Sequence, residues 1–239
     1  MIKISKTAFR WTITLSRTNK ANAINMEMLR KLNSILDAAK KEEQLRSLIF
    51  TGEGKVFSAG ADLDEVKKNN EITTTTQWEE LSEKIASIPC LTLAALNGTL
   101  AGGAFGMVLA CDLRIATPAA NFFYPVLKNN ILPQPNDIER MVDIAGISTA
   151  KLILLAGQKI SAQKALETHL IDQIAEKEVF ISTIDSLCSI AENNDGVSLL
   201  AIKRLFQAKC NSTIKKDALL AVFEKNDAAI KRLKELKKF

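Results

Sequence analysis

Hydrophobic residues recur along the chain with two different spacings, one typical of strands and the other typical of helices. Phe9, Trp11, Ile13 and Leu15 alternate with polar residues, which predicts a half-buried strand. The run from Leu91 to Leu96, by contrast, is apolar or uncharged at every position, which is typical of a strand buried on both faces. Such a strand lies near the middle of a sheet, so we expect the chain to be organised around this stretch.

Helical spacing appears first after Asn25, a candidate N-cap followed by an apolar stripe that includes Met28, Leu32 and Ile35. Because strands and helices alternate in the first half, we expect parallel pairing with right-handed crossovers. From Ile138 onward the pattern is helical, over roughly 138–145, 148–156, 162–168, 179–193, 197–209 and 213–237. The predicted organisation is a core over 1–193 and a C-terminal helical region over 194–239 that meets another subunit.

Polar residues and prolines predict where the regular elements stop. Gly146 and Gly157 are expected to end helices, and Ser161 is expected to begin one. The threonine-rich stretch 69–76 is predicted to be a mobile surface loop. Residues 122–126 are predicted to form an edge strand, because Pro125 cannot donate to a strand ladder.

The turn Asn97-Gly98 follows the buried strand and leads into a cluster of small residues. Gly102 and Gly103 open an apolar helix, although glycine destabilises a helix. Two adjacent glycines therefore suggest that another group approaches the backbone closely. This group is either a ligand or simply a tightly packed neighbouring strand, and the stretch alone leaves both interpretations open.

Composition and charge exclude several classes of protein. The 239 residues are 47% hydrophobic and 25% charged, as in an ordinary globular protein, and the net charge is +5. Basic residues gather in the tail Ile230–Phe239 rather than along the chain, so we predict no nucleic-acid partner. No apolar run is long enough to cross a membrane, and no targeting segment is recognisable.

Cysteine and histidine usage narrows the chemistry further. Cys90, Cys111, Cys188 and Cys210 show no metal-ligand spacing, and we expect reduced thiols in a cytoplasmic protein. With His169 as the single histidine, a Ser-His-Asp triad or a multi-histidine metal site is improbable. The sequence thus predicts neither a metal nor a redox cofactor.

Five short motifs, in this order and spacing, make the chain resemble the enoyl-CoA hydratase/isomerase, or crotonase, family. The resemblance extends from Trp11 to about Asp172. The motifs are Leu15-Ser16-Arg17 with Asn22-Ala23-Ile24-Asn25; Phe57-Ser58-Ala59-Gly60-Ala61-Asp62; Asn97-Gly98 with Ala101-Gly102-Gly103; Cys111-Asp112-Leu113-Arg114; and Gly157 with Ile160-Ser161-Ala162 and Ala165. The implied fold is α/β, a crotonase-like spiral of strand-strand-helix repeats with C-terminal helices, assembled as a homotrimer or a dimer of trimers.

The resemblance also implies a substrate class and a set of site residues. Enzymes of this family bind acyl-CoA thioesters and hold the thioester oxygen between two backbone N–H groups while an enolate forms. The matching donors here are the amides of Ala61 and Gly103. The coenzyme A portion of the substrate is expected near Lys20, Ala21, Ser58, Ala59 and Asp62, with Asp62 also capping a helix.

The chain departs from the family at both acid/base positions. The resemblance places the two glutamates of the hydratases at Gly106 and Val126, and an alternative aspartate at Gln134. None of these three side chains can transfer a proton. General acid–base catalysis contributes roughly 10²–10⁴-fold per group, so ordinary hydration should be severely impaired while the oxyanion hole is kept.

Three explanations remain open. Another residue substitutes, with Tyr124, Lys128, Asp137 and Glu139 near the segment that lines the pocket. Alternatively, the reaction needs little acid/base help, as in decarboxylation of a malonyl-type thioester, or the protein binds acyl-CoA without turnover. Tyr124 is the most suggestive substitute, although a packing aromatic with its hydroxyl at the rim is the favoured interpretation. Lys128 and Asp137 are expected to be solvated loop charges and His169 a surface helix-end residue.

The predicted function is therefore an acyl-CoA thioester enzyme of the hydratase/isomerase type that acts through an enolate. Ala61 and Gly103 would form the oxyanion hole, with Tyr124 as a tentative catalytic residue. The alternative is a catalytically silent acyl-CoA-binding or assembly subunit.

Overall fold

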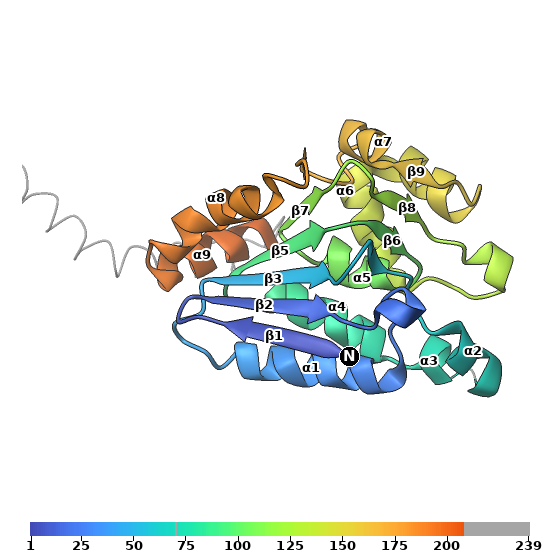
Figure 1. The fold of residues 1–239 in the computed structure, drawn as a ribbon, viewed down its shortest axis with the longest axis horizontal. Coiled ribbons are helices and arrows are strands. Elements are labelled where there is room, and N and C mark those ends of the chain that lie inside the picture. Colours follow the sequence, from blue (N-terminus) through green and yellow to red (C-terminus); the bar gives the residue numbers. More distant parts are fainter. Residues whose placement is uncertain (70, 208–239) are drawn as a thin grey trace, which may run out of the picture.

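The computed structural model describes residues 1–69 and 71–207, and it contains two β-sheets flanked by helices (Figure 1). The larger sheet has the order β1-β2-β3-β5-β7-β10 and the smaller has the order β4-β6-β8-β9. The larger sheet consists of β1 (Ile2–Lys6), β2 (Arg10–Leu15), β3 (Ser47–Gly52), β5 (Leu91–Leu96), β7 (Leu113–Ala116) and β10 (Gln173–Ile174). The smaller consists of β4 (Val56–Ser58), β6 (Thr99–Ala101), β8 (Asn121–Phe123) and β9 (Ile160–Ser161).

Successive strands are distributed between the two sheets in a regular way. β3, β5 and β7 enter the larger sheet, and β4, β6 and β8, which follow each of them, enter the smaller one. Each pair is followed by helical structure. All these neighbours pair in parallel, while β1–β2 and β8–β9 are antiparallel. The predicted strand-strand-helix spiral with parallel pairing is confirmed.

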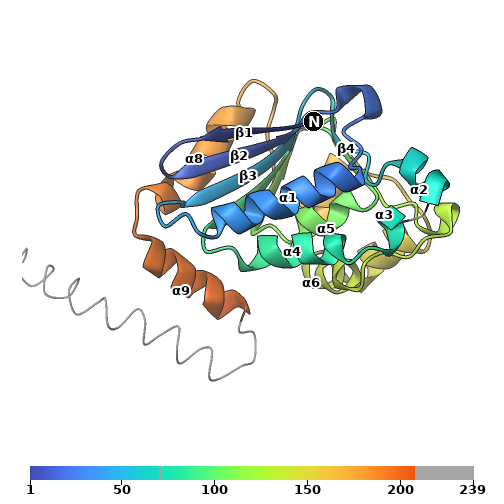
Figure 2. The same ribbon diagram turned by 90° about the horizontal axis from the view of Figure 1, so that it is seen from below.

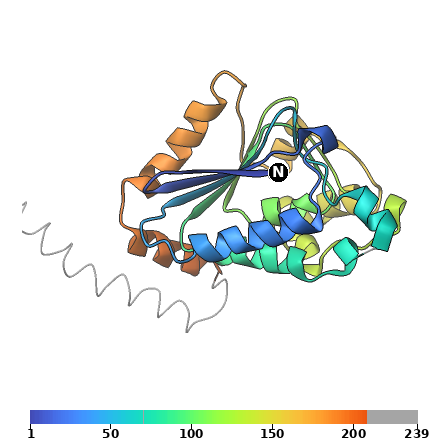
Figure 3. The same ribbon diagram turned by 60° about the horizontal axis from the view of Figure 1, so that its bottom comes forward.

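Helices lie on both sides of the larger sheet (Figures 2 and 3). On one side α1 (Met26–Ala39) lies beside α4 (Gln77–Ser87), followed by α5 (Ala104–Leu109) and α6 (Pro135–Leu154). On the other side α8 (Phe180–Glu192) buries Phe180, Ile184 and Cys188 against the sheet. The shorter α2 (Leu63–Asn69), α3 (Glu71–Thr74), α7 (Ala162–Glu167) and α9 (Gly196–Gln207) lie around this framework.

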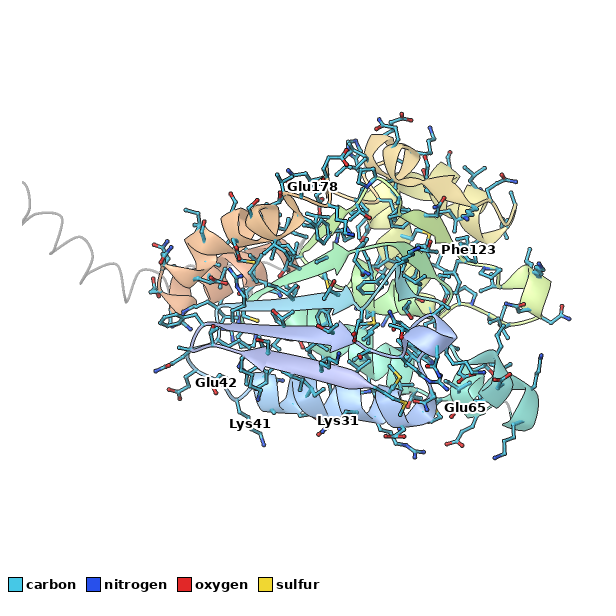
Figure 4. All side chains as sticks on the ribbon, in the orientation of Figure 1. Lys31, Lys41, Glu42, Glu65, Phe123 and Glu178 are labelled. Carbon is cyan, nitrogen blue, oxygen red and sulfur yellow. The ribbon has the colours of Figure 1, made fainter. Side chains whose placement is uncertain are left out.

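The strand β5 lies in the interior of the sheet, as its sequence predicts. Leu93, Ala94, Ala95 and Leu96 have no exposed surface, because helices cover both faces. The charged side chains of Lys31, Lys41 and Glu42 point outward from α1 and the turn after it (Figure 4).

The predicted helix caps are largely confirmed. The Asn25 side chain accepts a hydrogen bond from the Met28 amide at 2.9 Å, and the Ser161 side chain accepts one from the Lys164 amide at 3.2 Å. Gly157 adopts a φ of +63° beyond α6, as expected of a helix stop. Gly146, with φ +78°, is non-helical and separates the two helical stretches of α6 at a kink, as expected of a helix stop.

Two local predictions are wrong, and one strand was missed. The segment predicted as a mobile loop contains α3, and Ile72 within it is fully buried. β8 is not an edge strand, because it lies between β6 and β9 and Pro125 follows it. β1 was not predicted, although Ile2 and Ile4 alternate with polar residues in the manner of a half-buried strand.

A buried lysine attaches α9 to the larger sheet. Lys203 Nζ donates to the Cys90 carbonyl oxygen at 2.9 Å and to Asp112 Oδ2 at 2.8 Å. Asp112 Oδ2 also accepts from the Thr92 amide and the Thr92 hydroxyl, both at 2.8 Å. The Cys111-Asp112 motif therefore has a structural role, joining β5, β7 and α9.

A Lys203→Ala variant is expected to lower the free energy of unfolding by about 2 kcal/mol, because it removes a hydrogen-bonded charge from buried acceptors. Urea denaturation measures this change. Lys177→Ala, at an exposed position before α8, is the control. Equal, negligible effects of the two substitutions would contradict the anchoring role of Lys203.

The expected helix over 213–237 and Cys210 lie outside the described residues. Cys90, Cys111 and Cys188 are buried free thiols, in agreement with the reduced state predicted for them. Among the helices described, none is long and apolar enough to span a membrane. Residues 1–69 and 71–207 also contain no cluster of three His, Cys, Asp or Glu side chains suited to a metal ion.

Candidate active site

The loop after β4 exposes the amide of Ala61. The Ile24 amide donates to the Gly60 carbonyl oxygen at 2.8 Å, and the Asp62 amide donates to the Ile24 carbonyl oxygen at 2.9 Å. These bonds form a parallel bridge between Ile24 and Ala61. Since successive peptide groups of an extended segment point to opposite sides, the Ala61 N–H points away from Ile24. It donates no hydrogen bond to an acceptor in the described part of the chain.

The second loop joins β6 to α5 and exposes the amide of Gly103. The Gly102 amide is used, since it donates to the Phe123 carbonyl oxygen at 3.2 Å. Gly102 has a φ of +56°, which directs the chain into the helix and which glycine adopts without strain. Like the Ala61 amide, the Gly103 amide has no acceptor within residues 1–69 and 71–207.

The two loops are in direct contact. A Cβ atom added to Gly60 would stand 2.7 Å from the Ala101 carbonyl oxygen and 3.0 Å from the Gly103 nitrogen. Gly60 has a φ of +88°, so both the conformation and the close approach require glycine here. The sequence left open whether ligand approach or packing explains these small residues, and the structure shows that packing between the two loops is at least part of the answer.

Ala61 and Gly103 line the same small cavity, of about 30 Å³, enough for one or two water-sized groups. Its walls include Trp78, Tyr124 and Gln134. The Trp78 ring covers Gly103, and its Nε1 donates to the Ile72 carbonyl oxygen at 2.8 Å. This bond, together with the burial of Ile72, explains why α3 forms part of the cavity wall rather than a loose loop.

Tyr124 and Asp137 form a buried pair behind this cavity. The Tyr124 hydroxyl donates to Asp137 Oδ2 at 2.9 Å, and its ring stacks on Phe105 with a centroid separation of 5.3 Å. Tyr124 is 3% exposed and Asp137 is 1% exposed. Two expectations are therefore wrong: the Tyr124 hydroxyl is not at a solvated rim, and Asp137 is not a solvated loop charge, because it lies in the first turn of α6.

A glycine makes room for this carboxylate. A Cβ atom at Gly106, inside α5, would stand 2.6 Å from Asp137 Oδ1. Oδ1 has no hydrogen-bond partner among the described residues. The sequence signal for this arrangement was present, since a glycine interrupts an otherwise apolar helix at a cost of about 1 kcal/mol relative to alanine.

Burial controls the protonation of the pair. Removal from water raises the pKa of Asp137 to about 6. The charge of Glu79 also raises this pKa, whereas the Tyr124 hydrogen bond and the charge of Arg140 lower it. Burial, followed by the charge of Asp137, raises the pKa of Tyr124 well above 10. Tyr124 is therefore a neutral phenol at physiological pH, and Asp137 titrates close to neutrality.

The remaining candidate acid/base positions lie elsewhere. Lys128 and Glu139 are exposed, and His169 is an exposed residue with φ +60° after α7, as expected of a helix-end residue. Gln134 precedes α6 and lines the cavity. Val126 is buried and faces a different pocket.

The five residues predicted to contact coenzyme A lie close to one another. The Ala59 amide donates to the Ala21 carbonyl oxygen at 3.0 Å, and the exposed Lys20 pairs with Asp64 at 2.6 Å. Ser58 is buried, and its hydroxyl donates to the Asn22 carbonyl oxygen and accepts from the Gly60 amide. Asp62 pairs with Arg17 and accepts from the Asp64 amide at 2.9 Å, in agreement with a cap of α2.

A larger apolar pocket adjoins the cavity. It has a volume of about 360 Å³ and lies between the segment 126–133 and α6, and it shares Ile131 and Leu132 with the cavity. Leu132 is 85% exposed. The side chains that line it are almost all apolar, and Lys151 is the one charged residue among them.

Two sheets with mainly parallel pairing are wound in a spiral, and at the contact between consecutive turns they hold two amides that have no acceptor in the described chain; this arrangement defines the architectural class of the protein. The sequence matches the enoyl-CoA hydratase/isomerase family over residues 10–233, and the chain belongs to that family.

Individual relatives agree with this assignment. The chain is 31% identical to the putative enoyl-CoA hydratase/isomerase YngF of Bacillus subtilis, covering 80% of this chain and 75% of the relative. It is 27% identical to a short-chain-enoyl-CoA hydratase of Clostridium acetobutylicum, over 80% and 75% of the two chains. The crystal structure of an enoyl-CoA hydratase from Bacillus anthracis superposes with a TM-score of 0.88 at 27% identity, covering 99% of this chain and 96% of the other.

Proposed function

We propose that the protein is an enzyme that converts acyl-CoA thioesters through an enolate, held by the amides of Ala61 and Gly103. The observation that carries the proposal is that two backbone N–H groups without acceptors in the described chain line one small cavity. An unpaired amide is costly unless something accepts its hydrogen bond. A thioester oxygen that gains negative charge is an acceptor of the required kind.

The chemistry follows from the difference between the substrate and the enolate. A neutral thioester oxygen accepts weak hydrogen bonds, whereas an enolate oxygen accepts charge-assisted ones that are about twice as strong. Donors that are already oriented need no reorganisation as the charge develops, and each contributes roughly 2.7–4 kcal/mol to the stabilisation of the transition state. The contact between the two loops fixes the amides without side-chain participation.

The surroundings of the cavity support an acyl-CoA substrate. The apolar pocket that shares Ile131 and Leu132 with the cavity suits the acyl chain. Lys20, Ala21 and Ala59, exposed or half-buried beside the Ala61 loop, suit the coenzyme A portion, and the buried Ser58 and Asp62 support that surface through their bonds to Gly60 and Arg17. Coenzyme A enters as part of the substrate, and the proposal requires no further cofactor.

Turnover of a panel of thioesters tests this proposal. Crotonyl-CoA, a 3-enoyl-CoA and methylmalonyl-CoA are incubated with the protein, and products are separated by chromatography. We expect conversion of at least one enoyl thioester, with KM falling as the acyl chain is lengthened into the apolar pocket. Binding of every thioester without conversion of any would contradict the proposal and favour a silent acyl-CoA-binding subunit. Conversion of methylmalonyl-CoA alone would instead identify a decarboxylase.

The assembly and location belong to the same proposal. A homotrimer or a dimer of trimers is predicted through the family, with a cytoplasmic location and no nucleic-acid or membrane partner. Light scattering of the full chain measures the oligomeric state directly.

A further inference from the structure

We infer that Asp137 accepts the substrate proton through the Tyr124 hydroxyl, so that the two residues form a proton relay at the enolate site. This inference rests on the proposed function and adds the group that the oxyanion hole lacks. Forming the enolate of a saturated or 3-enoyl thioester requires a base that removes the α-proton. Among the side chains that line the cavity, none is a carboxylate. The base therefore lies outside the cavity and acts through a residue that lines it.

The position of Tyr124 makes it the link. It lines the cavity together with Ala61 and Gly103, and its hydroxyl donates to Asp137 Oδ2 at 2.9 Å. The phenol oxygen faces the Gln134 backbone with one lone pair and keeps a second lone pair as an acceptor, while its proton is directed at Asp137. It can therefore accept a proton on the cavity side and release one on the Asp137 side.

The step balances without an external reagent. The α-carbon–hydrogen bond breaks, and its electron pair enters the enolate, whose oxygen accepts from the two amides. The proton passes to Tyr124 Oη, while the hydroxyl proton of Tyr124 moves to Asp137 Oδ2. Tyr124 is a neutral phenol before and after the step, so its raised pKa is no obstacle. In the return step Asp137 gives the proton back, which permits delivery to a different carbon and thus a shift of the double bond.

The environment of Asp137 suits a base rather than a structural anion. Its Oδ1 has no partner among the described residues, although the side chain is 1% exposed. A structural carboxylate at this depth is normally satisfied by several donors. The under-solvated carboxylate binds a proton more strongly than a free aspartate does, as the pKa of about 6 indicates.

The charges that face Asp137 are few. Arg140 lies on the same helix, Glu79 faces it from α4, and Tyr124 comes from the segment after β8. The α5 residues that pack against it carry no titratable side chain. Gly106 belongs to that helix, and its missing side chain provides the space for the carboxylate.

Exchange of the α-protons of a bound thioester in D₂O tests the relay, because exchange requires reversible removal of the α-proton. Butyryl-CoA is incubated with the protein, and deuterium incorporation is followed by mass spectrometry. The wild-type rate is expected to rise with pH through an apparent pKa near 6 and then level off, because the deprotonated aspartate is the active form.

The variants Tyr124→Phe and Asp137→Asn are each expected to slow exchange at least about 100-fold, and Asp137→Asn is also expected to abolish the pH dependence near 6. Both substitutions preserve shape, and binding of butyryl-CoA by calorimetry shows whether the site is intact. Glu139→Gln, at an exposed position of the same helix, is the matched control.

The outcomes separate the two proposals. Failure of the wild type to convert any thioester of the panel would contradict the proposed function itself, whereas absence of butyryl-CoA exchange in a wild type that converts an enoyl thioester would overturn the relay alone. Exchange in the wild type that Tyr124→Phe and Asp137→Asn leave unchanged would overturn the relay alone. A Gly106→Ala variant adds an independent test: its Cβ would displace Asp137 Oδ1, so we expect slower exchange with an altered pH midpoint.

Discussion

Replacing Gly103 with proline is expected to lower kcat on an acyl-CoA substrate by about 10²–10³-fold while the protein stays folded. Proline removes one N–H donor from the proposed oxyanion hole and puts the ring Cδ in place of the amide hydrogen. Gly103 has φ −58°, which a proline ring adopts readily, and it directly precedes α5, where proline is tolerated. The lost amide has no acceptor in the described protein, so no structural hydrogen bond is broken.

The matched control is Gly103→Ala, which adds a Cβ but keeps the N–H group. That Cβ would lie 3.5 Å from the Trp78 ring, an ordinary contact distance. We therefore expect the alanine variant to retain most of the activity. Steady-state kinetics on both variants, with circular dichroism to verify folding, makes the comparison. Equal losses in the two variants would show that bulk at position 103, rather than the amide, matters.

An Asp137→Asn variant is expected to become more stable relative to the wild type as the pH rises, by about 2 kcal/mol between pH 4 and pH 8. The pKa of Asp137 is about 6 in the folded protein against 3.8 in a free aspartate. A group with a raised pKa stabilises the fold fully below its unfolded pKa, and this stabilisation is lost as the pH rises through the folded pKa. The difference of about two pKa units corresponds to about 3 kcal/mol over the full titration, and asparagine does not titrate.

Urea denaturation of both proteins at several pH values measures this gap, which is the difference in the free energy of unfolding between the variant and the wild type. The pH dependence of the stability difference is the critical quantity. A stability difference that is the same at every pH would also contain the effect of the new amide group beside Gly106. Glu139→Gln is the control and should show little change. A gap that is independent of pH would mean that Asp137 has an ordinary pKa, and a gap that shrinks with rising pH would reverse the assignment. A carboxylate that destabilises the fold at neutral pH is typical of a residue retained for function.

The sequence predicts the larger elements well, because their signals are local and repeated. The apolar run of β5 can be buried on both faces only in the interior of a sheet. The apolar stripe of α1 can be buried only when the helix packs against a sheet. The order of strands between the two sheets also follows from the resemblance to the family. The edge assignment of β8 failed because Pro125 lies just outside the strand, where it does not interrupt the ladder.

The cavity walls were harder to predict because they depend on single side chains far apart in the sequence. Ile72 is one apolar residue in a polar run, and its burial depends on the Trp78 hydrogen bond. Asp137 resembles a helix-start charge in sequence, and only Gly106, 31 positions earlier, explains its burial. The adjacent glycines Gly102 and Gly103, by contrast, were identified correctly as a place of close backbone approach.

The most direct measurement of the central claim is the ¹³C resonance of a thioester labelled at its carbonyl and bound to the protein. Two amides that converge on the oxygen polarise the carbonyl, so we predict a downfield shift on binding to the wild type and to Gly103→Ala. A smaller shift is predicted for Gly103→Pro, at equal occupancy. A resonance that stays at its free-solution position in the bound wild type would contradict the account.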